Sequence, residues 1–116
     1  QPMMPVPVWD NREEATATLR MTLDPALRAF QGHFPQAAIL PGVAQLDWAV
    51  RFGRQAFVLP TGFQRMDAVK FQRVARPGDE LTLHLDWDTG RGVLTFRYTS
   101  VHGVHASGRV VFADAH

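Results

Sequence analysis

The segment from Gln31 to Val50 reads QGHFPQAAILPGVAQLDWAV, and it contains the start of the helix around which the rest of the chain is expected to fold. Its Pro41-Gly42 pair predicts the start of a helix, because proline fits the first helical turn and glycine permits close approach to the backbone. After that start, apolar residues occur on almost every side for two turns, which is typical of a buried helix. We therefore expect one central helix from about residue 41 to residue 57.

Two ionisable residues stand out in this apolar segment. Between Arg28 and Arg51 the only formal charge is Asp47, and the only other group that titrates near neutrality is His33. A carboxylate inside a buried helix is costly unless it has a partner or a task, and desolvation would raise its pKa. Histidine is a workable base at cellular pH. We interpret His33 and Asp47 as the acid–base pair of an active site.

Length and composition indicate one ordinary globular domain. The chain has 116 residues, a formal net charge of +1, and 46% hydrophobic and 20% charged residues, which suits one domain with one core. So small a net charge draws the protein neither to nucleic acid nor to a membrane. The chain has no cysteine, which excludes thiolate metal sites and cysteine nucleophiles and fits a reducing, cytoplasmic compartment. We expect a single domain over residues 1–116, with an extended arm at residues 1–10.

Most of the remaining chain shows the two-residue alternation of half-buried strands. Apolar and polar residues alternate over residues 15–23, 81–87, 94–98 and 104–112. Residues 63–74 are less regular, so we expect a bulge there. One strand, a buried helix and four closely connected strands predict an α+β fold in which a curled antiparallel sheet wraps around the helix. The free edge of that sheet is expected to pair with a second copy, giving a dimer.

The central segment carries a specific resemblance. GHFP at residues 32–35, LPGV at residues 40–43 and then Asp47 follow the order of the hot-dog-fold β-hydroxyacyl-acyl-carrier-protein dehydratases, the FabA/FabZ class. The chain resembles this class over most of its length, from about residue 19 to residue 112. It departs from the class pattern at three positions, which are Gln36, Ala38 and Arg51.

Three further motifs narrow the resemblance to one branch. PGVAQLDWA at residues 41–49, KFQR at residues 70–73 and RPGD at residues 76–79 are similar to the ApeI-like dehydratases. That branch is associated with aryl polyene and related unusual fatty-acyl pathways. The resemblance implies the elimination of water from a 3-hydroxyacyl thioester to give a trans-2-enoyl thioester.

The resemblance also implies a role for each motif residue. His33 would be the base, Asp47 the acid or the group that orients a water molecule, and the N–H of Gly42 the oxyanion donor at a helix N-terminus. Phe34, Pro41 and Val43 would contribute to substrate binding. In such dimers the histidine and the acid of one site come from different subunits.

The resemblance further implies a partner and the absence of a metal or organic cofactor. The substrate would arrive on the phosphopantetheine of an acyl carrier protein, and the basic cluster of Lys70, Arg73 and Arg76 would receive that acidic partner. A homodimer is expected, with a heterodimer as the alternative.

Several other interpretations stay open from the residues alone. Asp47 and Arg51 are four apart on a helix and can form a simple surface ion pair, and His33 can be a structural loop histidine. The whole chain can instead be a hot-dog thioesterase, or a non-catalytic acyl-binding partner subunit. Among the other histidines, His102 and His105 are expected to face solvent rather than bind a metal, and His84 to lie on the outer face of the sheet.

Overall fold

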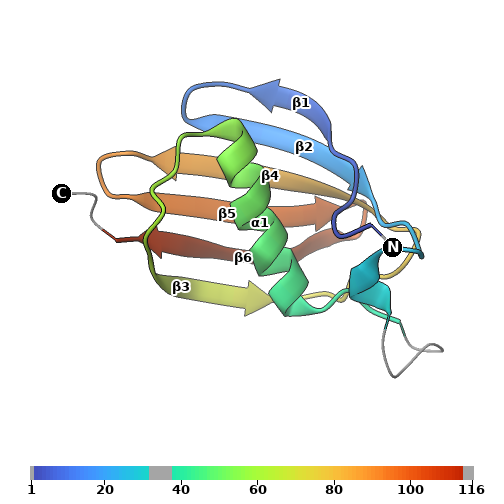
Figure 1. Ribbon diagram of the computed structural model, residues 1–116. Helices are drawn as coiled ribbons and strands as arrows, with labels where there is room; N and C mark the ends of the chain where they lie inside the picture. The colour runs from blue at the N-terminus through green and yellow to red at the C-terminus, as the bar shows by residue number, and fades with distance from the viewer. Residues whose placement is uncertain (1, 32–37, 114–116) are drawn as a thin grey trace.

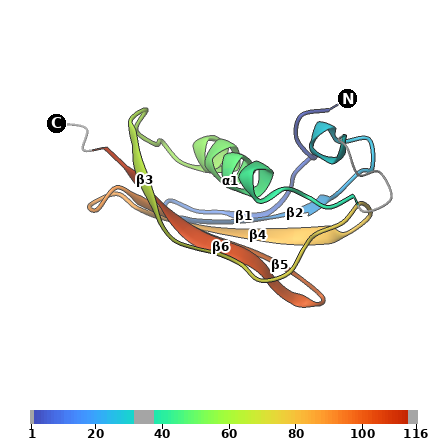
Figure 2. The same ribbon diagram turned by 90° about the horizontal axis from the view of Figure 1, so that it is seen from below.

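The computed structural model describes residues 2–31 and 38–113, which form an antiparallel sheet crossed by a helix (Figure 1). Its elements are β1 (Val8–Arg12), β2 (Thr16–Thr22), η1 (Arg28–Phe30), α1 (Gly42–Ala56), β3 (Phe63–Phe71), β4 (Glu80–Asp88), β5 (Val93–Ser100) and β6 (Gly103–Phe112). The six strands lie in the order β1-β2-β4-β5-β6-β3. Figure 2 shows the sheet curving around α1, so the predicted α+β architecture is confirmed.

Alternation along the strands decides which side chains meet the helix. In β4, Leu81, Leu83 and Leu85 are buried, while the polar residues between them lie on the outer face of the sheet. Leu83 stands opposite Leu19 of β2 and opposite Tyr98 of β5. Because paired strands keep this register, their buried side chains form continuous rows on the concave face. These rows and the buried face of α1 make the core.

The expected bulge lies in β3. The register of β3 against β6 shifts between Asp67 and Lys70, and Ala68 between them has a φ of 54°. An extra residue of this kind bends the strand and breaks the alternation of its side chains. β3 is also an edge strand, and its terminal residues Phe63 and Phe71 are both exposed.

Helix α1 matches the predicted bounds to within one residue at each end. Pro41 occupies the N-cap position, and the N–H of Phe57 closes the helix on the carbonyl of Gly53 at 2.8 Å. The expectation that the helix is buried all round is wrong, because the sheet covers only one of its faces. The buried face carries Gln45, Trp48, Ala49, Phe52 and Gly53.

The predicted N-terminal arm is also corrected in part. Residues 8–12 form the edge strand β1, in which Val8 pairs with Arg20 and Trp9 with Leu19. The register shifts between Trp9 and Asn11, so this short strand lacks the regular alternation that marks the others in the sequence. The ring of Trp9 packs edge-on against Phe52 of α1, with the ring centroids 6.2 Å apart.

Candidate functional site

A cavity of about 360 Å³ opens beside the first turn of α1. This is within the volume range of small-molecule sites. Its lining comes from the N-terminal part of α1, from the residues just before it and from the end of β3, and comprises Ile39, Leu40, Gly42, Gln45, Phe71, Gln72, Arg73 and Val74. The N–H of Leu40 donates to the carbonyl of Ala75 at 2.7 Å, which holds the two walls together. The cavity is therefore a mainly apolar site that ends against a helix N-terminus.

Gly42 is the residue of this site whose lack of a side chain matters. A Cβ atom at this position would lie 2.7 Å from Cζ and 2.8 Å from Cε1 of Phe71. The backbone N–H of Gly42 belongs to the first turn, where helix geometry supplies no intrahelical acceptor. Glycine thus lets an aromatic ring and a ligand approach an N–H that favours developing negative charge. Pro41 precedes it with extended backbone, and the adjacent Val43 is exposed.

Asp47 does not occupy the buried position expected for it. Its carboxylate accepts a hydrogen bond from Nε of Arg51 at 2.8 Å, and the two side chains are 49% and 54% exposed. This is the i,i+4 surface ion pair that the sequence left as the alternative. The premise of a desolvated carboxylate was wrong because Asp47 lies on the face of α1 that the sheet leaves uncovered.

Gln45 is a residue of the cavity that the motif analysis did not single out. It is 3% exposed, and its Nε2 finds no hydrogen-bond partner among the described residues. The phenol of Tyr98 donates to its backbone carbonyl at 2.6 Å, which ties α1 to β5. Burial raises the pKa of Tyr98 well above its ordinary value, and the negative charge of Asp47 raises it further. The signal available in the sequence was an uncharged polar residue within the apolar run that follows Pro41-Gly42.

The residues of the GHFP motif, with the predicted base His33 and the predicted substrate contact Phe34, lie outside the described residues. The structure brings Gly42 and Arg73 to one cavity and places Asp47 on another face of α1.

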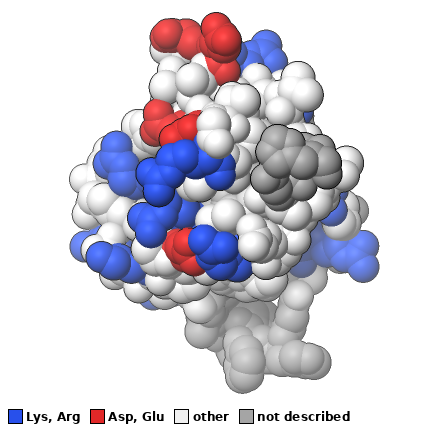
Figure 3. Space-filling model, turned by 90° about the vertical axis from the view of Figure 1, so that its left-hand side faces the viewer, with Lys and Arg blue, Asp and Glu red and all other residues white. Residues whose placement is uncertain are grey.

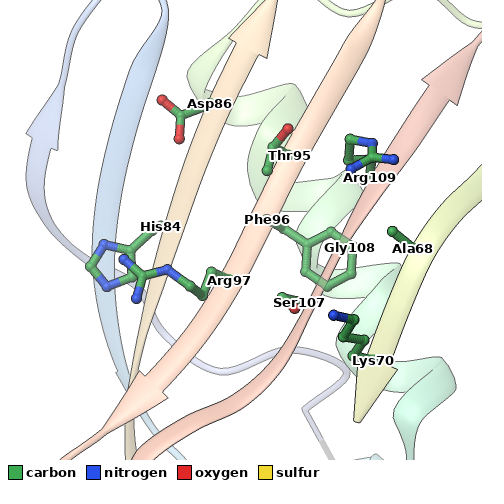
Figure 4. A pocket seen from close by; sticks show the side chains of 10 residues that line it. All are labelled: Ala68, Lys70, His84, Asp86, Thr95, Phe96, Arg97, Ser107, Gly108 and Arg109. Carbon is green, nitrogen blue, oxygen red and sulfur yellow. The ribbon is translucent and has the colours of Figure 1, made fainter. Parts of the chain in front are cut away.

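The predicted basic cluster is divided between two surfaces. Arg73 lines the cavity beside Gly42, and Arg76 is exposed in the turn before β4. Lys70 instead lines a hollow of about 280 Å³ on the outer face of the sheet, together with Arg97 and Arg109 (Figure 4). Lys70 lies within β3 and Arg73 just beyond its end, and the two side chains line different hollows, so the three basic residues are not gathered at one site.

His84 lies on the outer face of the sheet, as expected. Its Nε2 is 3.2 Å from Oγ1 of Thr99. Partial burial lowers the pKa of His84, and the positive charge of Arg97 lowers it further. Figure 4 shows the side chain of Arg97 extending beside His84.

The expectation for His105 was wrong, whereas His102 is exposed as expected. His105 is only 1% exposed and its Nε2 lies 2.6 Å from Oγ of Ser100. His105 lies near the start of β6, close to the turn that joins β5 to β6. The register between these strands shifts there, so buried and exposed side chains no longer alternate regularly.

The end of the sheet at the β4–β5 turn carries charges of both signs. Arg65, Asp67, Asp88, Arg91 and Arg109 line a hollow there. Arg65 pairs with Asp67 at 3.1 Å, and Figure 3 shows basic and acidic groups interspersed over this end of the molecule. Within residues 2–31 and 38–113, no cluster of three metal-ligating side chains occurs, and no helix is both long and apolar enough to cross a membrane.

Comparisons of the sequence with known proteins place the chain near acyl dehydratases. A family model described as ApeI dehydratase matches residues 9–109. The 3-hydroxyacyl-[acyl-carrier-protein] dehydratase FabZ of Lactococcus lactis subsp. cremoris is 31% identical over a 114-residue alignment, covering 87% of this chain and 76% of that protein. Alignments with three other FabZ dehydratases cover 44% to 48% of those proteins, so the chain spans about half the length of these curated relatives.

Comparisons of the structure agree with those of the sequence. The dehydratase heterocomplex ApeI:P from Xenorhabdus doucetiae matches with a TM-score of 0.88 and 33% identity, over 97% of this chain and 100% of that chain. A hypothetical thioesterase with coenzyme A from Streptococcus pneumoniae matches with a TM-score of 0.69 and 9% identity, over 93% and 89% of the two chains, which shows a shared fold alone. The sheet curled around α1 is the hot-dog fold.

Proposed function

The chain belongs to the ApeI-like dehydratase family, and we propose that it eliminates water from 3-hydroxyacyl thioesters carried on an acyl carrier protein. The product is a trans-2-enoyl thioester, formed in fatty-acid or aryl-polyene-like biosynthesis in the cytoplasm. The observation that carries this proposal is the apolar cavity of about 360 Å³ that ends at Gly42, in a chain of this family. An acyl chain needs an apolar cavity, and an enolate oxygen needs a donor of the kind that Gly42 offers.

The proposed reaction uses three groups of the protein. His33 takes the proton from C2, and the electron pair of that bond passes towards the thioester oxygen, where the N–H of Gly42 stabilises the charge. The pair then returns to form the C2–C3 double bond as the C3–O bond breaks. Asp47, directly or through a water molecule that it orients, gives a proton to the departing hydroxyl, which leaves as water. Phe34, Pro41 and Val43 shape the approach to the cavity.

The position of Asp47 supports a site shared between two subunits. Residues two apart on a helix point about 200° away from each other, so Asp47 cannot face the cavity that Gln45 of the same chain lines. Apolar side chains near the cavity mouth are also exposed, and β3 has a free edge. These exposed side chains are Ile39, Val43, Phe71 and Val74. We therefore propose a homodimer in which Asp47 of one subunit serves the cavity of the other; a heterodimer with a related hot-dog subunit is the alternative.

Subunit mixing tests this arrangement directly. His33→Ala and Asp47→Asn subunits are each inactive, but a mixed dimer contains one site that keeps both wild-type residues. Random pairing makes about half of the co-refolded dimers mixed, and each mixed dimer has one intact site out of two, so we expect about a quarter of wild-type activity. If the purified mixed dimer stays inactive, the shared site of a homodimer is refuted and the heterodimer takes its place.

Arg73 and Arg76 are the part of the basic cluster that we propose for carrier docking. Arg73 lines the cavity and Arg76 is exposed in the following turn. Charge complementarity with an acidic carrier protein would mainly speed association and align the phosphopantetheine with the cavity. Lys70, on the outer face of the sheet, is the weakest of the three candidates.

The primary test of the proposed function is enoyl formation from a 3-hydroxyacyl carrier protein. We expect wild-type turnover and a loss of about a hundredfold or more in both His33→Ala and Asp47→Asn, the size expected of a lost acid–base group. Asp10→Asn is the matched control, because Asp10 also forms an exposed ion pair, at 2.9 Å with Arg20. Wild-type protein that leaves the substrate intact would point to a non-catalytic acyl-binding subunit, and release of free thiol would point to a thioesterase.

A further inference from the structure

The carboxamide of Gln45 is a buried donor that the fold itself does not use. Its Nε2 finds no acceptor among the described residues, and the whole residue is 3% exposed. Buried polar groups in proteins are nearly always hydrogen-bonded, because leaving one unpaired is costly. A donor kept in this state on the inner face of α1 therefore points to an acceptor supplied by a ligand.

The surroundings of Gln45 show where such a ligand lies. Gln45 lines the same cavity as Gly42, with Leu40, Phe71 and Val74 as apolar neighbours. The hydrogen bond of 2.6 Å from Tyr98 to the backbone carbonyl of Gln45 fixes the helix at this point. The side chain thus starts from an anchored backbone atom and is, with Gln72 and Arg73, one of the polar residues in a mainly apolar lining.

The spacing along α1 suggests which atom of the ligand is bound. Gln45 follows Gly42 by three residues, so both lie on one side of the helix and are separated by roughly 4.5 Å of helical rise. In the proposed reaction, Gly42 faces the oxygen on C1 of the acyl group. A donor about one turn further along the helix is placed for an oxygen a short distance along the acyl chain, and the substrate carries one on C3.

We propose that Nε2 of Gln45 donates a hydrogen bond to the 3-hydroxyl oxygen of the substrate and makes the cavity selective for hydroxylated acyl groups. This inference rests on the proposed function, because it takes the acyl chain to lie in this cavity. Held in this way, the hydroxyl keeps its remaining lone pair free for the proton that it receives as it leaves. An analogue without the hydroxyl leaves the donor unpaired, which is the situation in which binding sites discriminate most strongly.

The test measures selectivity in binding rather than turnover. Two pantetheine thioesters of equal chain length, one 3-hydroxyacyl and one saturated, are titrated into the full chain in a His33→Ala background, so that neither ligand is consumed. We expect Gln45→Leu to weaken binding of the 3-hydroxyacyl ligand about tenfold, the size of one buried hydrogen bond. Binding of the saturated ligand should stay unchanged or become tighter.

Two further variants make the result decisive. Gln55→Leu is the matched control, because Gln55 is an exposed glutamine of the same helix, and it should leave both affinities unchanged. Gln45→Met keeps the unbranched shape and replaces Gln45→Leu if thermal unfolding shows that the leucine variant does not fold. Equal weakening of both ligands, or no weakening of either, would overturn the inference.

The outcomes separate this inference from the proposed function. An unchanged binding ratio in a protein whose wild type dehydrates its substrate overturns the role of Gln45 alone. A wild type that does not dehydrate overturns the proposed function, whereas the selectivity of binding remains measurable in the same samples.

Discussion

The hydrogen bond between Tyr98 and α1 gives a quantitative prediction for stability. Tyr98 is fully buried, and its hydroxyl donates to the backbone carbonyl of Gln45 at 2.6 Å. Tyr98→Phe removes this bond but keeps the ring and its edge-on contact with Phe96, whose centroid lies 6.2 Å away. The carbonyl keeps its intrahelical partner, so no acceptor is orphaned and the loss is that of one net hydrogen bond, about 1 kcal/mol.

Thermal unfolding measures that loss. For a domain of this size, about 1 kcal/mol corresponds to a fall in Tm of roughly 4 °C. An unchanged Tm would refute the anchoring of α1 by this hydroxyl, and a loss of several kcal/mol would show that the ring itself repacks.

Alkaline pH probes the same hydroxyl without a mutation. Burial, and then the charge of Asp47, hold the pKa of Tyr98 in the folded protein well above its ordinary value. The unfolded chain, with a tyrosine pKa of about 10, therefore loses its proton first as the pH rises. The contribution of Tyr98 to stability is fully present below about pH 10 and is lost as the pH rises from there towards the folded-state pKa.

One spectroscopic signal reports this titration, because Tyr98 is the only tyrosine of the chain. We expect phenolate absorbance to appear together with unfolding, and the alkaline fall in stability to be shallower in Tyr98→Phe. Reversible ionisation near pH 10 with the fold intact, followed by circular dichroism in the same samples, would refute the buried environment assigned to the phenol.

Two glycine substitutions separate the site from the core. In Gly42→Ala the new Cβ would lie 2.7 Å from the exposed ring of Phe71, which can move away. We therefore expect little change in Tm. We expect kcat/KM to fall about a hundredfold, because a small misplacement of the substrate costs that much. In Gly108→Ala the Cβ would lie 2.9 Å from Cζ of the fully buried Phe96 and 3.1 Å from Cγ2 of Val69. Such overpacking should lower stability by about 1–3 kcal/mol, and equal Tm losses in the two variants would contradict this distinction.

The regular strands were predictable because each carries its own signal. In β2 and β4 apolar residues recur at every second position, and the structure buries them. β1 was missed because five residues with a register shift give no usable period, and its pairing depends on β2 rather than on its own composition. The irregularity of β3 was visible in the sequence, but the surface that each basic residue reaches was not. Lys70 lines a hollow on the outer face and Arg73 lines the cavity, although they are three residues apart.

The sequence predicted only those parts of the candidate site whose position depends on neighbouring residues in the chain. Gly42 follows from the Pro-Gly pair, and the structure places it at the start of α1 with a cavity beside it. The exposure of Asp47 did not follow from its apolar neighbours, because it depends on which face of the helix the sheet covers. Burial of His105 likewise depends on the irregular register between β5 and β6, which no short stretch of sequence encodes.

The exposed position of Asp47 fits the proposed shared site once the geometry of the whole helix is considered. A hot-dog sheet covers one face of α1, and that face already supplies Gly42 and Gln45 to the cavity. An acid on the same face would have to share the space with these residues and with the core. An acid on the opposite face reaches a cavity only if another subunit brings that cavity to it. The hydrogen bond of 2.8 Å from Nε of Arg51 holds the carboxylate on that face. The same encounter would cover the exposed apolar residues at the cavity mouth, so assembly and completion of the site become one event.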